Sequence, residues 1–314
     1  MQLKKIKIGN IETPNNVFFA PLAGYSDAIM RSLCYTLGAG LCFTEMVSAK
    51  GLYYSPNASS DIIFTYPNEK IKAIQIFGND PEFIKRAVDN PLIEKFDIID
   101  INMGCPVPKI FSNGEGSALM QNFSLASKVI KSACQGSKPV TVKFRTGITD
   151  DKPLTRDFAV MAEDSGASLI TIHGRSKTAV YSGECNYAEI EKAKNAVKIP
   201  VIANGGVFSV DDANRLIENT GADGVMLARG VLENPFLISN LTGFTPKFTL
   251  KQFILKQIEL ASERYGYERS AILLRKQMAF YLKGATGGKK LKEQVFSASN
   301  AGELINIIES SNCF

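Results

Sequence analysis

The sequence has no tryptophan and a single histidine, His173, among its 314 residues. One histidine excludes a histidine-rich metal site and argues against hydrolases that depend on a Ser-His or Cys-His pair. The six cysteines stand at positions 34, 42, 105, 134, 185 and 313, without a CxxC pair or regular spacing. We therefore expect free thiols and neither a zinc site nor a disulfide framework.

Long apolar runs are also missing from the chain. No stretch approaches the roughly 18 to 20 apolar residues that a membrane span requires, and the basic N-terminal segment lacks the apolar core of a secretion signal. We expect a protein of the cytoplasm without a membrane domain. The chain is 45% hydrophobic and 21% charged, as in globular proteins, and its formal charge of +5 only weakly suggests a polyanionic partner.

Short apolar runs do alternate with amphipathic stretches between residues 17 and 230, a pattern typical of βα units. Eight units in series favour a closed (β/α)8 or TIM barrel, in the α/β class, over an open sheet. Strands are predicted at 17–20, 41–47, 73–78, 98–104, 140–145, 169–174, 201–206 and 224–229. Helices are predicted between them, for example at 80–90, 124–134, 155–166 and 209–221.

The strand pattern stops after Pro235, and helices are predicted at 249–266, 268–284, 289–297 and 300–310. We expect a barrel domain at 1–243 and a small all-helical domain at 244–314. The second helix carries Arg275 and Lys276 beside aromatic residues. This basic segment is compatible with a solvated helix face and with a nucleic-acid-binding surface, and the pattern does not choose between them.

Polar side chains stand at the C-terminal ends of the predicted strands, where the reactive groups of a TIM barrel lie. They are Gln75, Asn102, Lys143, Arg145, His173, Arg175, Asn204 and Arg229. The glycines at 205 and 206, together with the turn at Ala228 and Arg229, match the usual phosphate site of these barrels. A tight turn alone is the alternative explanation of the two glycines.

Two of these polar residues have alternative explanations. A buried Lys143 ammonium needs an anionic partner, which is either a flavin pyrimidine that becomes negative on reduction or an internal carboxylate of Glu45 or Asp100. Gln75 is either an interior hydrogen-bonding residue or a contact for the donor and acceptor edge of a flavin.

Cys105 stands between Gly104 and Pro106, in a turn just past the fourth predicted strand. A thiol in that turn faces the strand-end site, although cysteines are more often small buried hydrophobes. A thiol with an ordinary pKa of about 8.5 is mostly protonated at neutral pH. Cys105 is therefore better suited to act as a general acid than as a nucleophile without a base.

In order along the chain, these segments resemble the dihydrouridine synthases, flavoenzymes that reduce uridine to 5,6-dihydrouridine in tRNA, and the bacterial type is the most similar. The resemblance spans nearly the whole chain. Its main motifs are APLAGYSD (20–27), DINMGCPVPKI (100–110), VKFRTG (142–147), ITIHGRSKTAVYSG (170–183), ANGGVFSVDDA (203–213) and GVMLARGVLENP (224–235). RKQMAFYLKG (275–284) looks like the start of the family's helical RNA-binding domain.

The resemblance implies FMN as the cofactor, NADPH or NADH as the reductant, and tRNA as the substrate; we expect a monomer. Hydride would pass from FMN N5 to uracil C6, and Cys105 would protonate C5. The implied cofactor contacts are Pro21, Leu22, Ala23, Gln75, Lys143, His173, Asn204, Gly205, Gly206, Ala228 and Arg229. Asn102 and Arg145 would contact the target uracil, and Arg175, Lys177, Arg275 and Lys276 are assigned to the RNA.

One position departs from the family pattern: Lys177 stands where an arginine is expected, so the charge is kept but the planar fork is lost. The target base would have to turn out of the tRNA stack at a cost of a few kcal/mol, which contacts from the basic helical segment would offset.

Two other functions would explain part of this pattern. A flavin dehydrogenase of the dihydroorotate type would share the barrel, FMN, lysine and cysteine, but it has less use for a basic helical tail. A non-enzymatic RNA-binding module would not need Cys105, Lys143 and His173 together.

Overall fold

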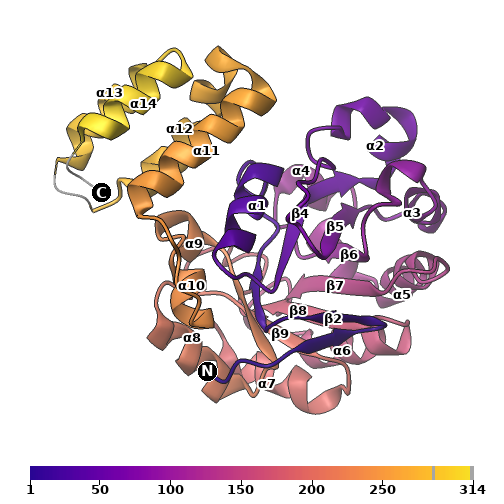
Figure 1. Cartoon of the computed structure of the whole chain (residues 1–314). Helices are drawn as coiled ribbons and strands as arrows, with labels where there is room; N and C mark the ends of the chain where they lie inside the picture. The colour runs from indigo at the N-terminus through magenta and orange to yellow at the C-terminus, as the bar shows by residue number, and fades with distance from the viewer. Residues whose placement is uncertain (285–286, 312–314) are drawn as a thin grey trace.

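The computed structural model describes residues 1–284 and 287–311 (Figure 1). Cys313 and the last residues of the predicted C-terminal domain lie outside these ranges. The other five cysteines are free thiols, as predicted. No helix within the described ranges is long and apolar enough to cross a membrane.

Eight parallel strands close into a barrel in the order β10-β3-β4-β5-β6-β7-β8-β9, which confirms the predicted fold class (Figure 1). Each corresponds to a predicted run. Because β9 and β10 end before the predicted limits, Gly205 and Gly206 lie in the turn after β9, and Arg229 begins the short helix that follows β10. The strands are β3 (Val17–Phe19), β4 (Leu41–Ser48), β5 (Lys72–Phe77), β6 (Ile98–Met103), β7 (Val140–Arg145), β8 (Leu169–His173), β9 (Val201–Asn204) and β10 (Gly224–Leu227).

Helices cover the outside of the barrel, and the four predicted ones begin and end within two residues of their expected limits. Side-chain caps explain several of the starts: the Asp80 side chain accepts from Glu82 N, and the Ser209 side chain accepts from Asp212 N. The helices are α1 (Ala28–Thr36), α2 (Ala49–Tyr54), α3 (Pro81–Val88), α4 (Pro108–Ser112), α5 (Phe123–Ala133), α6 (Thr155–Asp164), α7 (Tyr187–Ala196), α8 (Val210–Thr220), α9 (Arg229–Glu233) and α10 (Leu237–Thr242), with 3₁₀ turns η1 (Pro56–Ser59), η2 (Pro91–Ile93) and η3 (Gly116–Gln121).

A hairpin of β1 (Ile6–Ile8) and β2 (Ile11–Thr13), which was not predicted, closes one end of the barrel. Ile6 and Ile8 are buried in one cluster with interior residues from the starts of the strands, such as Leu41 and Ile98. This apolar plug fills the N-terminal end. An open cavity inside the barrel must therefore lie at the C-terminal ends of the strands.

Four further helices follow the predicted C-terminal ranges: α11 (Leu250–Tyr265), α12 (Tyr267–Tyr281), α13 (Gly288–Ser297) and α14 (Ala301–Ser310). Figure 1 shows them as a bundle beside the barrel, next to α1 and α9. A buried hydrogen bond joins the bundle to the barrel, since Gln277 Nε2 of α12 donates to Leu232 O of α9 at 3.2 Å. Within the bundle, Tyr281 Oη of α12 donates to Gln257 Oε1 of α11 at 2.9 Å. A domain boundary at 243/244 stays a prediction.

Candidate active site

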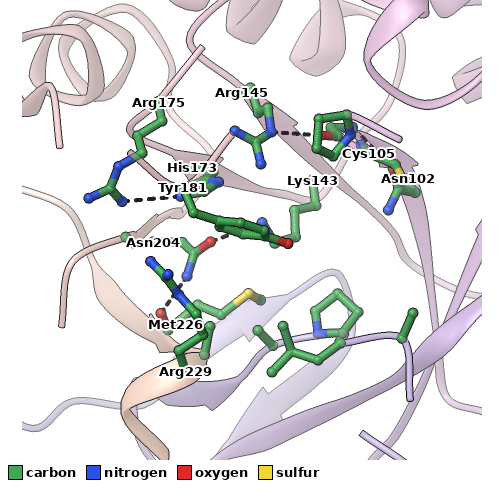
Figure 2. Close-up of a pocket in the computed structure, with 18 of the residues that line it drawn as sticks. Asn102, Cys105, Lys143, Arg145, His173, Arg175, Tyr181, Asn204, Met226 and Arg229 are labelled. Atoms are coloured by element: carbon green, nitrogen blue, oxygen red, sulfur yellow. Dashed lines mark hydrogen bonds between the residues drawn. The ribbon is translucent and has the colours of Figure 1, made fainter. Parts of the chain in front are cut away.

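A cavity of about 1070 Å³, counted out to its open mouth, lies at the C-terminal ends of the barrel strands (Figure 2). It brings together residues from segments far apart in the sequence. Among its lining are Pro21, Leu22, Ala23, Gln75, Asn102, Cys105, Lys143, Arg145, His173, Arg175, Asn204, Gly205, Gly206, Ala228 and Arg229. Cys105, all the predicted cofactor contacts, and the two residues predicted to contact uracil therefore share one cavity.

Lys143 of β7 contributes a buried ammonium to this cavity. Its Nζ donates to Asn204 Oδ1 at 3.0 Å, and Asn204 Nδ2 donates in turn to Met226 O at 2.7 Å. Burial lowers the pKa of Lys143 to about 8, as does the nearby Arg145. Within residues 1–284 and 287–311, Lys143 forms no salt bridge, so the internal ion pair considered above is not made.

The cavity carries a surplus of positive charge. Its lining, as far as the structure describes the chain, contains Lys143, Arg145, Arg175 and Arg229 but no carboxylate. Burial first, and then the charges of these four residues, lower the pKa of His173 well below its ordinary value, so its imidazole is neutral at pH 7. A cationic cavity without counter-charges fits an anionic ligand.

Two of the cations also hold the loop that follows β8. Arg145 NH1 donates to the carbonyls of Ser176 and Val180, at 2.8 Å each, and Arg175 NH2 donates to Gly183 O at 2.8 Å. Arg145 Nε donates at 2.8 Å to the carbonyl of Gly104, which precedes Cys105. Arg145 therefore links the loop after β8 to the turn after β6.

Tyr181 lies on the loop held in this way, and sequence reasoning did not identify it as a cavity residue. Its ring centroid is 4.7 Å from the Arg229 guanidinium and 6.4 Å from the His173 ring centroid (Figure 2). Half of the Tyr181 side chain is exposed. The only sequence signal was its place in the HGR-x5-YSG segment, because an isolated tyrosine in a loop has no periodicity to reveal its direction.

The glycine-containing turn after β9 and the start of α9 form one wall of the cavity. Gly205 and Gly206 have φ angles of 127° and 73°, which residues other than glycine rarely adopt. A Cβ on Gly230, the second residue of α9, would lie 2.2 Å from Val207 O, so only glycine lets α9 pack this closely against the turn after β9. The backbone that lines the cavity at these glycines and the Arg229 charge are suited to a phosphate group.

Cys105 lies in the turn after β6 with its side chain at the cavity. Its N–H donates to Asn102 Oδ1 at 2.9 Å, and its carbonyl accepts from Ser117 N at 3.1 Å and from Ser117 Oγ at 2.8 Å. Burial raises the pKa of the thiol, although Val107 N–H and the Arg145 charge act in the opposite direction. The thiol is thus protonated at neutral pH and can give up a proton.

Asn102 is already fully hydrogen-bonded. Oδ1 accepts from Gly104 N at 3.1 Å and from Cys105 N, while Nδ2 donates to Gln75 Oε1 at 2.8 Å and contacts Met46 Sδ at 3.7 Å. Asn102 therefore positions the Cys105 turn. A direct contact with uracil stays a prediction, and it would require Asn102 to give up the weak contact with sulfur.

Three residues assigned to the RNA lie outside the cavity. Lys177 Nζ is 4.3 Å from the centroid of the Phe111 ring. Arg275 NH2 donates at 2.8 Å to the carbonyl of Ala298, which follows α13, so Arg275 joins two helices of the bundle. Lys276 is exposed on α12. Their contacts with RNA stay predictions.

Comparisons with known proteins agree on the family. A model of the dihydrouridine synthase (Dus) family matches residues 18–313. The "tRNA-dihydrouridine synthase B" of Pasteurella multocida (strain Pm70) is 34% identical over 289 residues, covering 89% of this chain and 87% of that protein. The "Probable tRNA-dihydrouridine synthase 1" of Synechocystis sp. (strain ATCC 27184 / PCC 6803 / Kazusa) is 33% identical, covering 98% of this chain and 89% of that protein.

Solved structures are similar in fold at much lower identity. The 6-hydroxypseudooxynicotine amine oxidase HisD from Pseudomonas geniculata N1 has a TM-score of 0.61 at 13% identity, covering 77% of this chain and 49% of that one. The structure of TcOYE with pHBA has a TM-score of 0.59 at 13% identity, and the match covers 78% of this chain and 93% of that one. These likenesses support the barrel fold alone. The family model and the relatives show more: the chain belongs to the dihydrouridine synthase family.

Proposed function

We propose that this protein is a tRNA-dihydrouridine synthase that reduces the C5–C6 double bond of uracil in specific uridines of tRNA. FMN would be the bound cofactor, and NADPH or NADH the reductant. One observation carries the proposal: a single cationic cavity combines a protonated thiol at Cys105, a buried ammonium at Lys143 and a glycine-rich wall. The relatives named above, whose names state action on tRNA, support the substrate class.

The described residues fit FMN. The cavity-lining backbone of Gly205 and Gly206 would hold its phosphate together with Arg229, and Gln75 and Lys143 would contact its pyrimidine ring. Pro21, Leu22, Ala23, His173, Asn204 and Ala228 would complete the cofactor contacts. When bound, FMN supplies the hydride for uracil C6. The surplus of positive charge fits both the phosphate and the negative charge that a reduced flavin gains.

Cys105 would hold the proton destined for uracil C5. Its raised pKa keeps Sγ protonated until the base is in place. The Arg145 charge and the Val107 N–H both favour the thiolate that remains after proton transfer, because both lower the thiol pKa. General acids in such positions typically contribute about 10²- to 10⁴-fold to the rate.

The RNA would lie across the cavity mouth and the helical bundle. Asn102, Arg145 and Arg175 would contact the uracil or its sugar-phosphate. Lys177, Arg275 and Lys276, the last two in a tRNA-binding domain at 244–314, would contact the rest of the tRNA. Such phosphate contacts would offset the cost of turning the base out of its stack. We propose further that the protein acts as a monomer in the cytoplasm.

The test uses the full chain with unmodified tRNA transcripts, FMN and NADPH, followed by mapping of dihydrouridine along the RNA. We expect dihydrouridine at one or a few defined positions. Dihydroorotate and orotate serve as competing small substrates. Turnover of orotate without change in the tRNA would favour the dihydroorotate-type dehydrogenase, and tRNA binding without FMN uptake would favour a non-enzymatic module.

A further inference from the structure

Asp100 is a buried carboxylate to which the function proposed above gives no role. It lies on β6, two residues before Asn102 on the same side of the strand, and is 1% exposed. Its Oδ1 accepts from Thr141 Oγ1 at 2.5 Å, and its Oδ2 accepts from Gln75 Nε2 at 2.7 Å. It does not line the cavity. Burying a carboxylate is costly even when it is hydrogen-bonded. We therefore ask what the bond from Asp100 to Gln75 contributes.

The direction of each hydrogen bond around Gln75 is set from both ends. At one end the N–H groups of Gly104 and Cys105 can only donate, so Asn102 must turn Oδ1 toward them and Nδ2 toward Gln75. At the other end, an ionised Asp100 can only accept, so Gln75 must turn Nε2 toward it. Both ends require the same orientation of the Gln75 amide.

This orientation determines what Gln75 offers to the cavity. One N–H of Nε2 is used by Asp100 and one lone pair of Oε1 is used by Asn102. One donor and one acceptor remain, in a fixed order. The pyrimidine edge of a flavin alternates carbonyl acceptors with an N–H donor, and a rotated amide would place like groups against it.

We propose that Asp100 is a positioning residue that holds the Gln75 amide in the one orientation able to hydrogen-bond to the pyrimidine edge of FMN. The inference rests on the proposed function only in taking FMN as the ligand. Through Asn102, the same chain of hydrogen bonds joins Gln75 to the backbone of Cys105. The residue that would contact the cofactor and the residue that would act as the acid are therefore fixed relative to each other.

The test is a double-mutant cycle read by FMN titration of the apoprotein and by the visible absorption of bound flavin. Asp100→Ala should weaken FMN binding about tenfold or more and change the absorption, because Gln75 can then rotate. In a Gln75→Ala background the same substitution should have almost no effect. Asp100→Asn, which keeps an acceptor in one of its two amide orientations, should restore part of the affinity.

Thr141→Val is the matched control, since it removes the other partner of the same carboxylate and leaves the bond to Gln75. It should keep FMN affinity within about threefold. If Asp100→Ala does not fold, the same cycle with Asp100→Asn decides. An equal loss in both backgrounds, or no loss in either, overturns the inference. If the wild-type protein itself takes up no FMN, the proposed function fails instead.

Discussion

Lys143 and Asn204 are joined across the barrel interior by a 3.0 Å hydrogen bond from Nζ on β7 to Oδ1 on β9. Asn204 cannot turn its amide away, because its Nδ2 donates to Met226 O. The ammonium thus has a neutral acceptor that fixes its position, and its charge is only partly compensated, by the Asp100 carboxylate, with which it forms no salt bridge. Any anion that enters the cavity gains from that charge.

FMN affinity should therefore depend on pH through Lys143. Its pKa is lowered to about 8, so the ammonium is charged below that pH and neutral above it. Binding of an anion should weaken by up to about tenfold per pH unit above pH 8. FMN titrations of the apoprotein between pH 7 and 9 measure this step. Lys143→Met should bind more weakly and lose the step; a flat wild-type profile would contradict the argument.

Cys105→Ala should lower the rate of tRNA reduction by about 10²- to 10⁴-fold, because the proton donor is lost. FMN content and tRNA affinity should not change, since the turn around residue 105 is held through its backbone. Single-turnover assays with prereduced enzyme measure the step directly. Full activity in this variant would refute the role of Cys105 as the acid.

Gly230→Ala should disrupt the glycine-rich wall. The new Cβ would lie 2.2 Å from Val207 O, so backbone atoms would have to move apart. We expect FMN to bind about tenfold or more weakly. Gly221→Ala is the control: it adds strain at a φ of 63° but meets no atom within 4 Å. That control should lower the free energy of unfolding by about 1 to 2 kcal/mol without affecting FMN affinity.

Arg275 and Lys276 should differ although they are neighbours. Arg275→Ala removes the bond to Ala298 O and should lower the free energy of unfolding by about 1 to 3 kcal/mol. Lys276→Glu should leave stability unchanged, weaken tRNA binding and reduce its salt dependence by about one ion. Lys131→Glu, which makes the same charge change at an exposed position of α5, is the control. Equal effects of both lysine changes would argue against a tRNA contact at Lys276.

Asp100 should affect stability in a pH-dependent way. Burial raises the pKa of Asp100 from 3.8 to about 6, so the folded state binds the proton more tightly than the unfolded state. The resulting gain in the free energy of unfolding is fully present below pH 3.8 and is lost as the pH rises through 6. Relative to Asp100→Asn, the wild type should lose about 2 kcal/mol between pH 4 and 7. Urea unfolding of both proteins measures the difference. Parallel profiles would mean that Asp100 has an ordinary pKa.

Much of the barrel was predictable because each strand and helix depends mainly on the pattern of neighbouring residues in the sequence. Each strand is a short apolar run, and caps such as Ser209 mark helix starts. The three-residue strands of the N-terminal hairpin were missed because a run that short carries too little periodicity. Tyr181 was missed for a related reason, since a loop residue has no pattern that shows where its side chain points.

The sequence by itself determined the elements, their order, and the kinds of side chain at the strand ends, because these depend on neighbours along the chain. Only the tertiary structure decided which atoms of those side chains meet. The hydrogen bonds between Asn102 and Gln75, and between Lys143 and Asn204, join residues 27 and 61 positions apart. Such partners, and the direction in which each amide must turn, exist only once the barrel has closed.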